Sequence, residues 1–86
     1  MTLRWADEAL EDYRWWLKHD ARLHRRINKL IDAIEKEPFR GIGKPEPLRH
    51  EWSGYWSRRI NEEHRLIYKV EKGVIFIAAC RYHYGK

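Results

Sequence analysis

Residues 55–60 (YWSRRI), 65–70 (RLIYKV) and 74–84 (VIFIAACRYHY) have the two-residue periodicity of β-strands. Their even positions are apolar or aromatic apart from one arginine, and we expect them to face a core. These positions are Trp56, Arg58, Ile60, Leu66, Tyr68, Val70, Val74, Phe76, Ala78, Cys80 and Tyr82. The odd positions include the polar or cationic residues Ser57, Arg59, Arg65, Arg81 and His83. We expect these to form an open, functional face of an antiparallel sheet.

This division into two faces depends on the lengths of two hairpin loops, because the pairing register fixes the face of each side chain. An odd number of loop residues keeps the even positions together. Glu71-Lys72-Gly73 fits a three-residue loop in which glycine takes the left-handed conformation. The loop around residues 61–64 must then hold three or five residues, since two or four would place Arg59 and Arg65 on opposite faces.

The composition fits one cytoplasmic domain spanning residues 1–86. A mass of 10.6 kDa allows a single core, and 43% hydrophobic with 36% charged residues is typical of a globular protein. We expect no membrane segment and no leader, because the longest apolar run, residues 74–80, is too short to span a bilayer. The one cysteine, Cys80, indicates packing in a reducing compartment. A net charge of +5 favours a polyanionic partner.

Two amphipathic helices are expected before the strands. Thr2–Trp5 can form a short edge strand, and Asp7 can begin the first helix. A second helical stripe ends before Pro38 and consists of Leu23, Ile27, Leu30, Ile31 and Ile34. Leu48–Trp52 is expected to add a strand. We therefore predict an α+β fold, β-α-α followed by four antiparallel strands, with both helices on one face of a twisted antiparallel sheet.

Residues 38–47 (PFRGIGKPEP) form the one stretch rich in glycine and proline. Two glycines permit unusual backbone angles and three prolines stiffen the rest, so the loop is constrained. Glu46 lies between two prolines, and a carboxylate on so rigid a support suits general base catalysis. A turn residue that happens to be acidic is an equally good interpretation of the loop alone. Arg49 and His50 follow closely enough to line the same cleft.

These residue types suit RNA cleavage by attack of the 2′-hydroxyl on the adjacent phosphate. The reaction needs a base, cations and an acid, and it requires no metal or other cofactor. Glu46 can be the base and His83, with an unperturbed pKa of about 6.5, can be the acid. Arg65 with a neighbouring arginine can hold the phosphate, and Tyr84 can stack on a base or steady the phosphate. Each acid or base would contribute about 10²–10⁴-fold to the rate.

Four blocks of the sequence resemble the Txe/YoeB family of the RelE-like superfamily. They are residues 43–48 (GKPEPL), 53–60 (SGYWSRRI), 62–68 (EEHRLIY) and 78–84 (AACRYHY). The resemblance implies a single RelE-like toxin domain, with a fold like that of microbial ribonucleases, that cleaves mRNA in the ribosomal A site of the 30S subunit. It also implies a homodimer and neutralisation by a YefM-type antitoxin.

The resemblance assigns roles to individual positions. The implied catalytic residues are Glu46 as general base, Arg65 as phosphate ligand, His83 as general acid and Tyr84 as an orienting residue. The supporting contacts to RNA or phosphate are implied for Arg49, His50, Ser57 and Arg59. The strand periodicity adds Arg81 to these cations.

Two rival functions fit part of the pattern. A gyrase-inhibiting toxin of the ParE kind would share the architecture without the nuclease chemistry, and it would still arrest growth after Glu46→Gln or His83→Gln. A basic RNA-binding module without activity would also tolerate those neutral substitutions. It would bind RNA more weakly after charge reversal at Arg59 or Arg65, as salt-dependent phosphate contacts require.

Overall fold

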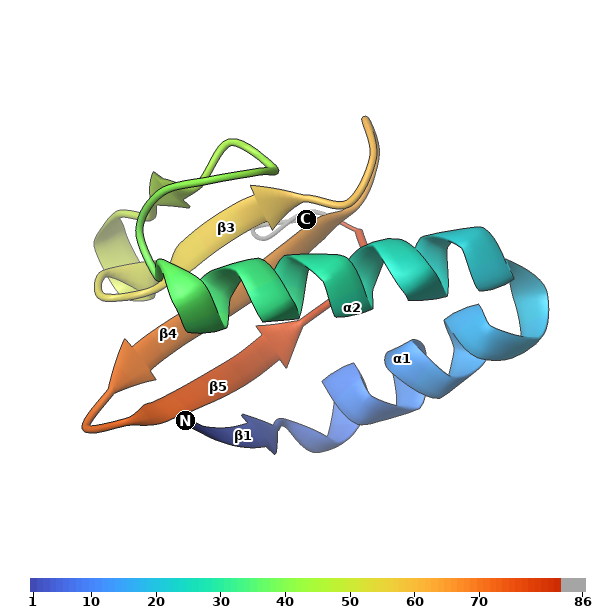
Figure 1. Cartoon of the computed structure of the whole chain (residues 1–86), viewed down its shortest axis with the longest axis horizontal. Coiled ribbons are helices and arrows are strands. Elements are labelled where there is room, and N and C mark those ends of the chain that lie inside the picture. Colours follow the sequence, from blue (N-terminus) through green and yellow to red (C-terminus); the bar gives the residue numbers. More distant parts are fainter. Residues whose placement is uncertain (83–86) are drawn as a thin grey trace.

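The computed structural model describes residues 1–82 and shows two helices packed on a five-stranded sheet (Figure 1). In chain order the elements are β1 (Thr2–Trp5), α1 (Asp7–His19), α2 (Ala21–Lys36), β2 (Glu46–Pro47), the 3-10 helix η1 (His50–Trp52), β3 (Trp56–Arg59), β4 (Arg65–Glu71) and β5 (Val74–Ala79). The predicted α+β class and the order of two helices before the main strands are confirmed.

The strand order is β1-β5-β4-β3-β2. Strands β2 to β5 pair in the antiparallel manner that the sequence predicts, whereas β1 lies parallel to β5, with Leu3 opposite Ile75. The sheet is therefore mixed. Parallel pairing of two strands requires a long connection between them. The helices and the strands β2 to β4 lie between β1 and β5 in the chain, so β5 can run beside β1 in the same direction.

The two helices form one layer because their apolar stripes face the same side of the sheet. In α2 the side chains of Ile27, Leu30 and Ile34 are fully buried. The helices are joined at Asp20, whose carboxylate accepts a hydrogen bond of 3.2 Å from the backbone N–H of Leu23 and so caps α2. The prediction of two helices before the strands, packed on one face of the sheet, is confirmed.

The hairpin between β3 and β4 has the predicted register. Arg59 lies directly opposite Arg65, and the loop between them, residues 60–64, contains five residues. Among the even positions, Arg58 of β3 and Leu66 and Tyr68 of β4 are fully buried, while Trp56 and Val70 are partly buried against the core. The two arginines therefore share the face of the sheet away from the helices.

The hairpin between β4 and β5 differs from the prediction. Glu71 pairs with Val74, so the loop is a two-residue turn, Lys72-Gly73, with both residues at positive φ. An even loop length exchanges the faces of β5. Ile75 and Ile77 enter the core, and the expected placement of Val74 and Phe76 in the core is wrong.

A bulge then restores the predicted alternation at the end of β5. The register shifts between Ile67 and Tyr68, which pair with Ala79 and Ile77, so that Ala78 is the extra residue. Cys80 consequently returns to the core, where it is fully buried. The prediction that even positions face the core is thus correct at Cys80 and wrong at Val74 and Phe76.

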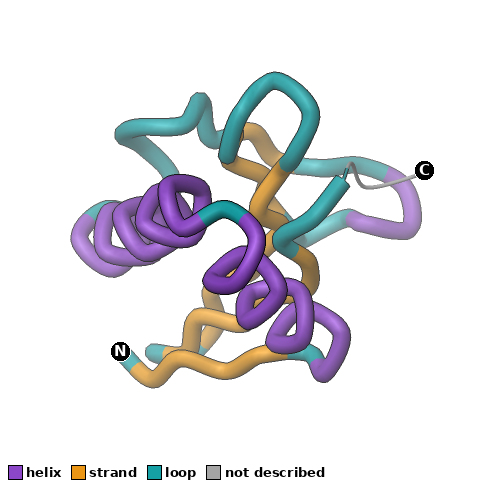
Figure 2. Tube along the Cα trace, turned by 90° about the vertical axis from the view of Figure 1, so that its right-hand side faces the viewer, coloured by secondary structure: helices purple, strands orange, loops and turns teal. Residues whose placement is uncertain are grey.

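The predicted strand at Leu48–Trp52 is also wrong. The Leu48 N–H still bonds the carbonyl of Tyr55 at 2.9 Å, but the chain then turns into η1, where the Ser53 N–H bonds the carbonyl of His50 at 3.0 Å. His50 has a φ of 60°, which a continuing strand does not allow. Figure 2 places η1 on the other side of the strands from α2, next to the open face of the sheet.

Candidate active site

A pocket of about 500 Å³ lies on the open face, where β2 and η1 meet β3 and the start of β4. It is lined by Glu46, Pro47, Leu48, Arg49, His50, Ser57 and Arg65. The structure therefore brings five of the predicted site residues together around one hollow. They come from three segments of the chain, and the carboxylate and the cations face a common space.

Glu46 is placed by strand pairing. It lies opposite Ser57 in the β2–β3 ladder, and its side chain is exposed while Ser57 is buried. Pro47 lies opposite Trp56 in the same ladder, and the Leu48 N–H adds one further bond to the Tyr55 carbonyl at 2.9 Å before the chain turns into η1. The short strand therefore holds Glu46 at the rim of the pocket on a defined backbone.

The loop that leads to Glu46 is held by Arg58, the arginine in the buried register. Its guanidinium is fully buried and donates to the carbonyls of Glu37 at 2.7 Å, Arg40 at 2.9 Å and Ile42 at 3.1 Å. Its Nε donates to the Tyr68 hydroxyl at 3.0 Å. One core cation thus satisfies three carbonyls of a loop that has no regular partner.

Tyr68 extends this arrangement. Its hydroxyl donates to the carbonyl of Pro38 at 2.8 Å. Burial raises the pKa of the Tyr68 hydroxyl, although the hydrogen bond and the positive charge from Arg58 act to lower it. The backbone of Gly43 completes the contact, since its carbonyl accepts the Arg59 N–H at 2.6 Å. The loop is therefore held by the sheet at both ends.

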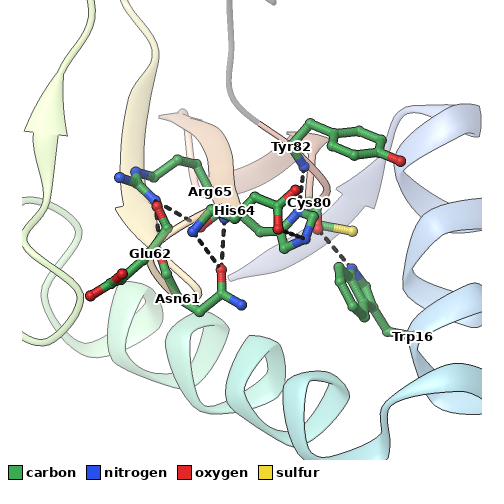
Figure 3. Close-up of polar contacts among 8 residues, drawn as sticks. Trp16, Asn61, Glu62, His64, Arg65, Cys80 and Tyr82 are labelled. Carbon is green, nitrogen blue, oxygen red and sulfur yellow. Dashed lines mark hydrogen bonds and ion pairs between the residues drawn. The ribbon is translucent and has the colours of Figure 1, made fainter.

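Arg65 is oriented by the five-residue loop before it. Its Nη1 donates to the carbonyls of Asn61 at 2.8 Å, His64 at 3.1 Å and Glu62 at 3.2 Å (Figure 3). The Asn61 carboxamide in turn accepts the N–H groups of Glu63 and His64 at 2.9 and 2.7 Å. One edge of the guanidinium is thereby fixed beside the pocket before any ligand binds.

The remaining predicted site residues are placed differently. Arg59 is exposed beside Arg65 on the same face. Arg81 is not in the pocket, because β5 ends at Ala79 and the guanidinium of Arg81 instead packs over the ring of Trp15 at 3.7 Å, near α1. The expected place of Arg81 on the functional face is therefore wrong. His83 and Tyr84 lie outside the described residues.

Tyr82, the last described residue, lies beside the start of β4. Its N–H donates to Nδ1 of His64 at 2.7 Å, and its carbonyl accepts the N–H of Arg65 at 3.1 Å. The sequence predicted His64 as part of a turn and gave no signal for this contact. The arginine among apolar even positions was, in contrast, a visible signal for the buried role of Arg58.

Within residues 1–82, no group of three or more His, Cys, Asp and Glu side chains is arranged to hold a metal ion. In the same part of the chain, no helix combines the length and the apolar character needed to cross a membrane.

Comparison with known proteins gives a consistent family match. The model of the "YoeB-like toxin of bacterial type II toxin-antitoxin system" family matches residues 5–84. Toxin YoeB of Escherichia coli K12 is 54% identical over 84 residues, which cover 98% of this chain and 100% of that protein. These alignments include nearly every residue of the chain.

Solved structures agree with the sequence matches. A YoeB/ParE toxin from Agrobacterium tumefaciens has a TM-score of 0.94 and 43% identity, covering 98% of this chain and 100% of that one. A YoeB–YefM complex and a YoeB dimer from Staphylococcus aureus have TM-scores of 0.91 and 0.92 with 41% and 42% identity, and each comparison covers 98% of both chains.

Proposed function

The chain belongs to the YoeB family of bacterial type II toxins, and we propose that it is a ribosome-dependent endoribonuclease that cleaves mRNA in the A site of the 30S subunit. It acts in the cytoplasm, where translation takes place, and inhibits protein synthesis. The reaction is attack of a ribose 2′-hydroxyl on the adjacent phosphate, which breaks the bond to the 5′-oxygen of the next nucleotide and leaves a 2′,3′-cyclic phosphate.

The observation that carries this proposal is that Glu46 and Arg65 line the same pocket. Glu46 takes the proton of the 2′-hydroxyl, and Arg65 binds the phosphate as negative charge develops on its oxygens. Its Nη1 is directed at loop carbonyls within the described residues, so Nε and Nη2 are the donors that we assign to the phosphate. The loop carbonyls order the Arg65 side chain before RNA binds, so RNA binding does not have to restrict its conformations.

The other groups of the pocket have supporting roles. Arg49 and His50 follow Glu46 at the rim and contact the RNA backbone together with Ser57. Arg59, next to Arg65, adds positive charge on the approach to the pocket. His83 donates the proton to the departing 5′-oxygen, and Tyr84 orients the nucleotide. No metal or cofactor is needed for this sequence of proton transfers.

We further propose that a YefM-type antitoxin neutralises this toxin by covering the same face. The related S. aureus protein was solved in a YoeB–YefM complex, and at 41% identity over 98% of the chain this face is expected to be shared. The S. aureus YoeB dimer supports a homodimer for this chain also. Acidic antitoxin side chains would be attracted to the arginines around the pocket.

Toeprinting on ribosomes programmed with a defined mRNA tests the proposal. Wild type is expected to cut the mRNA in the A site, whereas Glu46→Gln and His83→Gln should slow the cut by about 10²–10⁴-fold each. Glu11→Gln is the matched control, because Glu11 is exposed on α1 and lies outside the pocket. Cleavage that persists in both site variants would exclude Glu46 and His83 as the base and the acid of this mechanism. A wild type that arrests growth without cutting mRNA would favour a toxin of the ParE kind, and one that only binds RNA would favour a simple RNA-binding module.

A further inference from the structure

His64 connects the start of β4 to the end of the described chain. The residue is buried, with 7% of its surface exposed, and its Nδ1 accepts the N–H of Tyr82 at 2.7 Å. The next residue, Arg65, donates its N–H to the Tyr82 carbonyl at 3.1 Å. Both backbone polar groups of Tyr82 are therefore bonded, one to the side chain of His64 and the other to the backbone of Arg65, the first residue of β4 (Figure 3).

Tyr82 needs this support because its backbone is strained. Its φ is 64°, in the left-handed region that costs a non-glycine residue about 1–2 kcal/mol. Its side chain is 42% exposed and so contributes little burial to offset that cost. Strained conformations of this kind persist where surrounding contacts determine them, and the contacts of Tyr82 include the two backbone hydrogen bonds to residues 64 and 65.

The hydrogen bond from Tyr82 also determines which nitrogen of the neutral imidazole carries the proton. Nδ1 can accept a hydrogen bond only when it carries no proton, so the neutral ring has its proton on Nε2. Nε2 lies 3.6 Å from the Glu63 carboxylate. The ring is therefore placed with its lone pair toward the backbone of Tyr82 and its N–H toward an acid.

Aromatic packing keeps the ring in this orientation. Trp16 of α1 contacts the His64 ring edge-on, with 4.8 Å between the centroids, and its Nε1 donates to the carbonyl of Cys80 at 2.9 Å. The ring of Tyr82 lies on another side at 5.4 Å. A single cluster of side chains thus holds the backbone at residues 80 and 82.

We propose that His64 is a positioning residue for the cleavage reaction. Its Nδ1 lone pair fixes the strained backbone of Tyr82, the residue that directly precedes His83 and Tyr84 in the sequence. His64 acts through Tyr82 and does not touch the RNA. The inference rests on the proposed function, since it concerns the residues to which the general acid and its neighbour are assigned.

Two substitutions at His64 separate positioning from packing. The Oδ1 of asparagine is as many bonds from Cα as Nδ1 of histidine, so His64→Asn keeps an acceptor for the Tyr82 N–H but removes the ring. His64→Phe keeps a ring against Trp16 but has no acceptor. A packing role predicts that phenylalanine is the better replacement, whereas a positioning role predicts that asparagine is.

We compare both variants with wild type by the single-turnover rate of mRNA cleavage on programmed ribosomes. The KM for ribosomes and the free energy of unfolding are measured for the same variants. We expect His64→Phe to lower the rate about 10–100-fold with little change in KM, as a misplaced catalytic group does. His64→Asn should recover most of the rate although it is the less stable variant. A wild-type rate in His64→Phe, or equal losses in both variants, would overturn the role of His64.

Nuclear magnetic resonance of the wild-type protein provides a measurement that does not need activity. The ¹⁵N shifts of His64 should show an unprotonated Nδ1 and a protonated Nε2, and the Tyr82 amide proton should shift upfield in His64→Phe as its hydrogen bond is lost. A protonated Nδ1 would overturn the proposal. If instead the wild type fails to cleave mRNA on the ribosome, it is the proposed nuclease function that fails.

Discussion

Arg59 and Arg65 lie directly opposite each other in the antiparallel pair of β3 and β4. Two like charges in this relationship disfavour the sheet, because cross-strand neighbours are close enough to repel. The structure directs Nη1 of Arg65 to the carbonyls of the preceding loop, while Arg59 stays exposed. Repulsion between the two arginines therefore lowers the stability of the sheet slightly, and the same arrangement places two cations beside the pocket.

The first prediction follows from this opposition. Arg59→Gln should raise the free energy of unfolding by about 0.2–1 kcal/mol, because it removes the repulsion across the strands. The same substitution should weaken binding of a single-stranded RNA oligonucleotide and reduce the salt dependence of that binding by about 0.7 in the logarithmic slope. Urea unfolding and binding at several salt concentrations measure the two effects.

Arg22→Gln serves as the control for Arg59→Gln, since Arg22 is exposed on α2 and lies on the helical side of the molecule. It removes the same charge without relieving the opposition between Arg59 and Arg65. If both variants had the same stability and the same salt slope, net charge alone would explain the behaviour of Arg59.

The second prediction concerns Arg58, whose guanidinium bonds three loop carbonyls. Arg58→Met should lower the free energy of unfolding by about 3 kcal/mol or more, because it leaves these buried acceptors unpaired. Tyr68→Phe removes one donor to the loop and the acceptor of the Arg58 Nε, and it should cost about 1–3 kcal/mol, less than Arg58→Met. Urea unfolding of both variants gives the ranking, and a Tyr68→Phe loss as large as that of Arg58→Met would contradict it.

The sequence predicts those parts of the fold that depend on local periodicity. The apolar stripe of α2 and the shared face of Arg59 and Arg65 were correct because each follows from spacing along a single helix or hairpin. The faces of β5 were wrong at Phe76, since one residue more or less in a turn reverses every side chain that follows. The parallel pairing of β1 depends on contacts between distant segments, which spacing does not encode.

The site shows the same division. A carboxylate on a Pro-flanked loop and cations on one strand face are visible in the sequence, and the structure gathers Glu46, His50 and Arg65 around one pocket. Arg81 occupies an odd position, as the predicted functional face requires, but it follows the end of β5. The alternation of side chains along a strand therefore does not apply to it, and its guanidinium packs over Trp15. The bond from Tyr82 to His64 joins residues 18 positions apart and has no sequence signature.

The third prediction concerns Cys80. Burial, with a smaller contribution from the Asp12 carboxylate, raises the pKa of its thiol to about 12, although Arg81 acts to lower it. The unfolded thiol loses its proton at lower pH than the folded one, so the stability linked to Cys80 is present below pH 9 and is lost as the pH rises toward 12.

Comparison with Cys80→Ala isolates this contribution from the other titrating groups. From pH 8 to pH 10 the advantage of wild type over Cys80→Ala in the free energy of unfolding should shrink by about 1.4 kcal/mol, the value of one pH unit above the unfolded pKa. Urea unfolding at the two pH values gives the difference. An advantage that stayed constant or grew with pH would show that the folded thiol ionises as readily as the unfolded one.

The last prediction tests which atom attacks the phosphate. If the nucleophile is the 2′-hydroxyl activated by Glu46, a single 2′-deoxy substitution at the scissile nucleotide should stop cleavage, because the attacking group is absent. Uncut ribosome-bound mRNA should then accumulate, while a 2′-deoxy nucleotide one codon upstream should leave the cut unchanged and serves as the control. Products from the unmodified mRNA should carry a 2′,3′-cyclic phosphate and a 5′-hydroxyl. Cleavage of the deoxy substrate, or a 3′-hydroxyl on the upstream product, would require attack by water and a different role for Glu46.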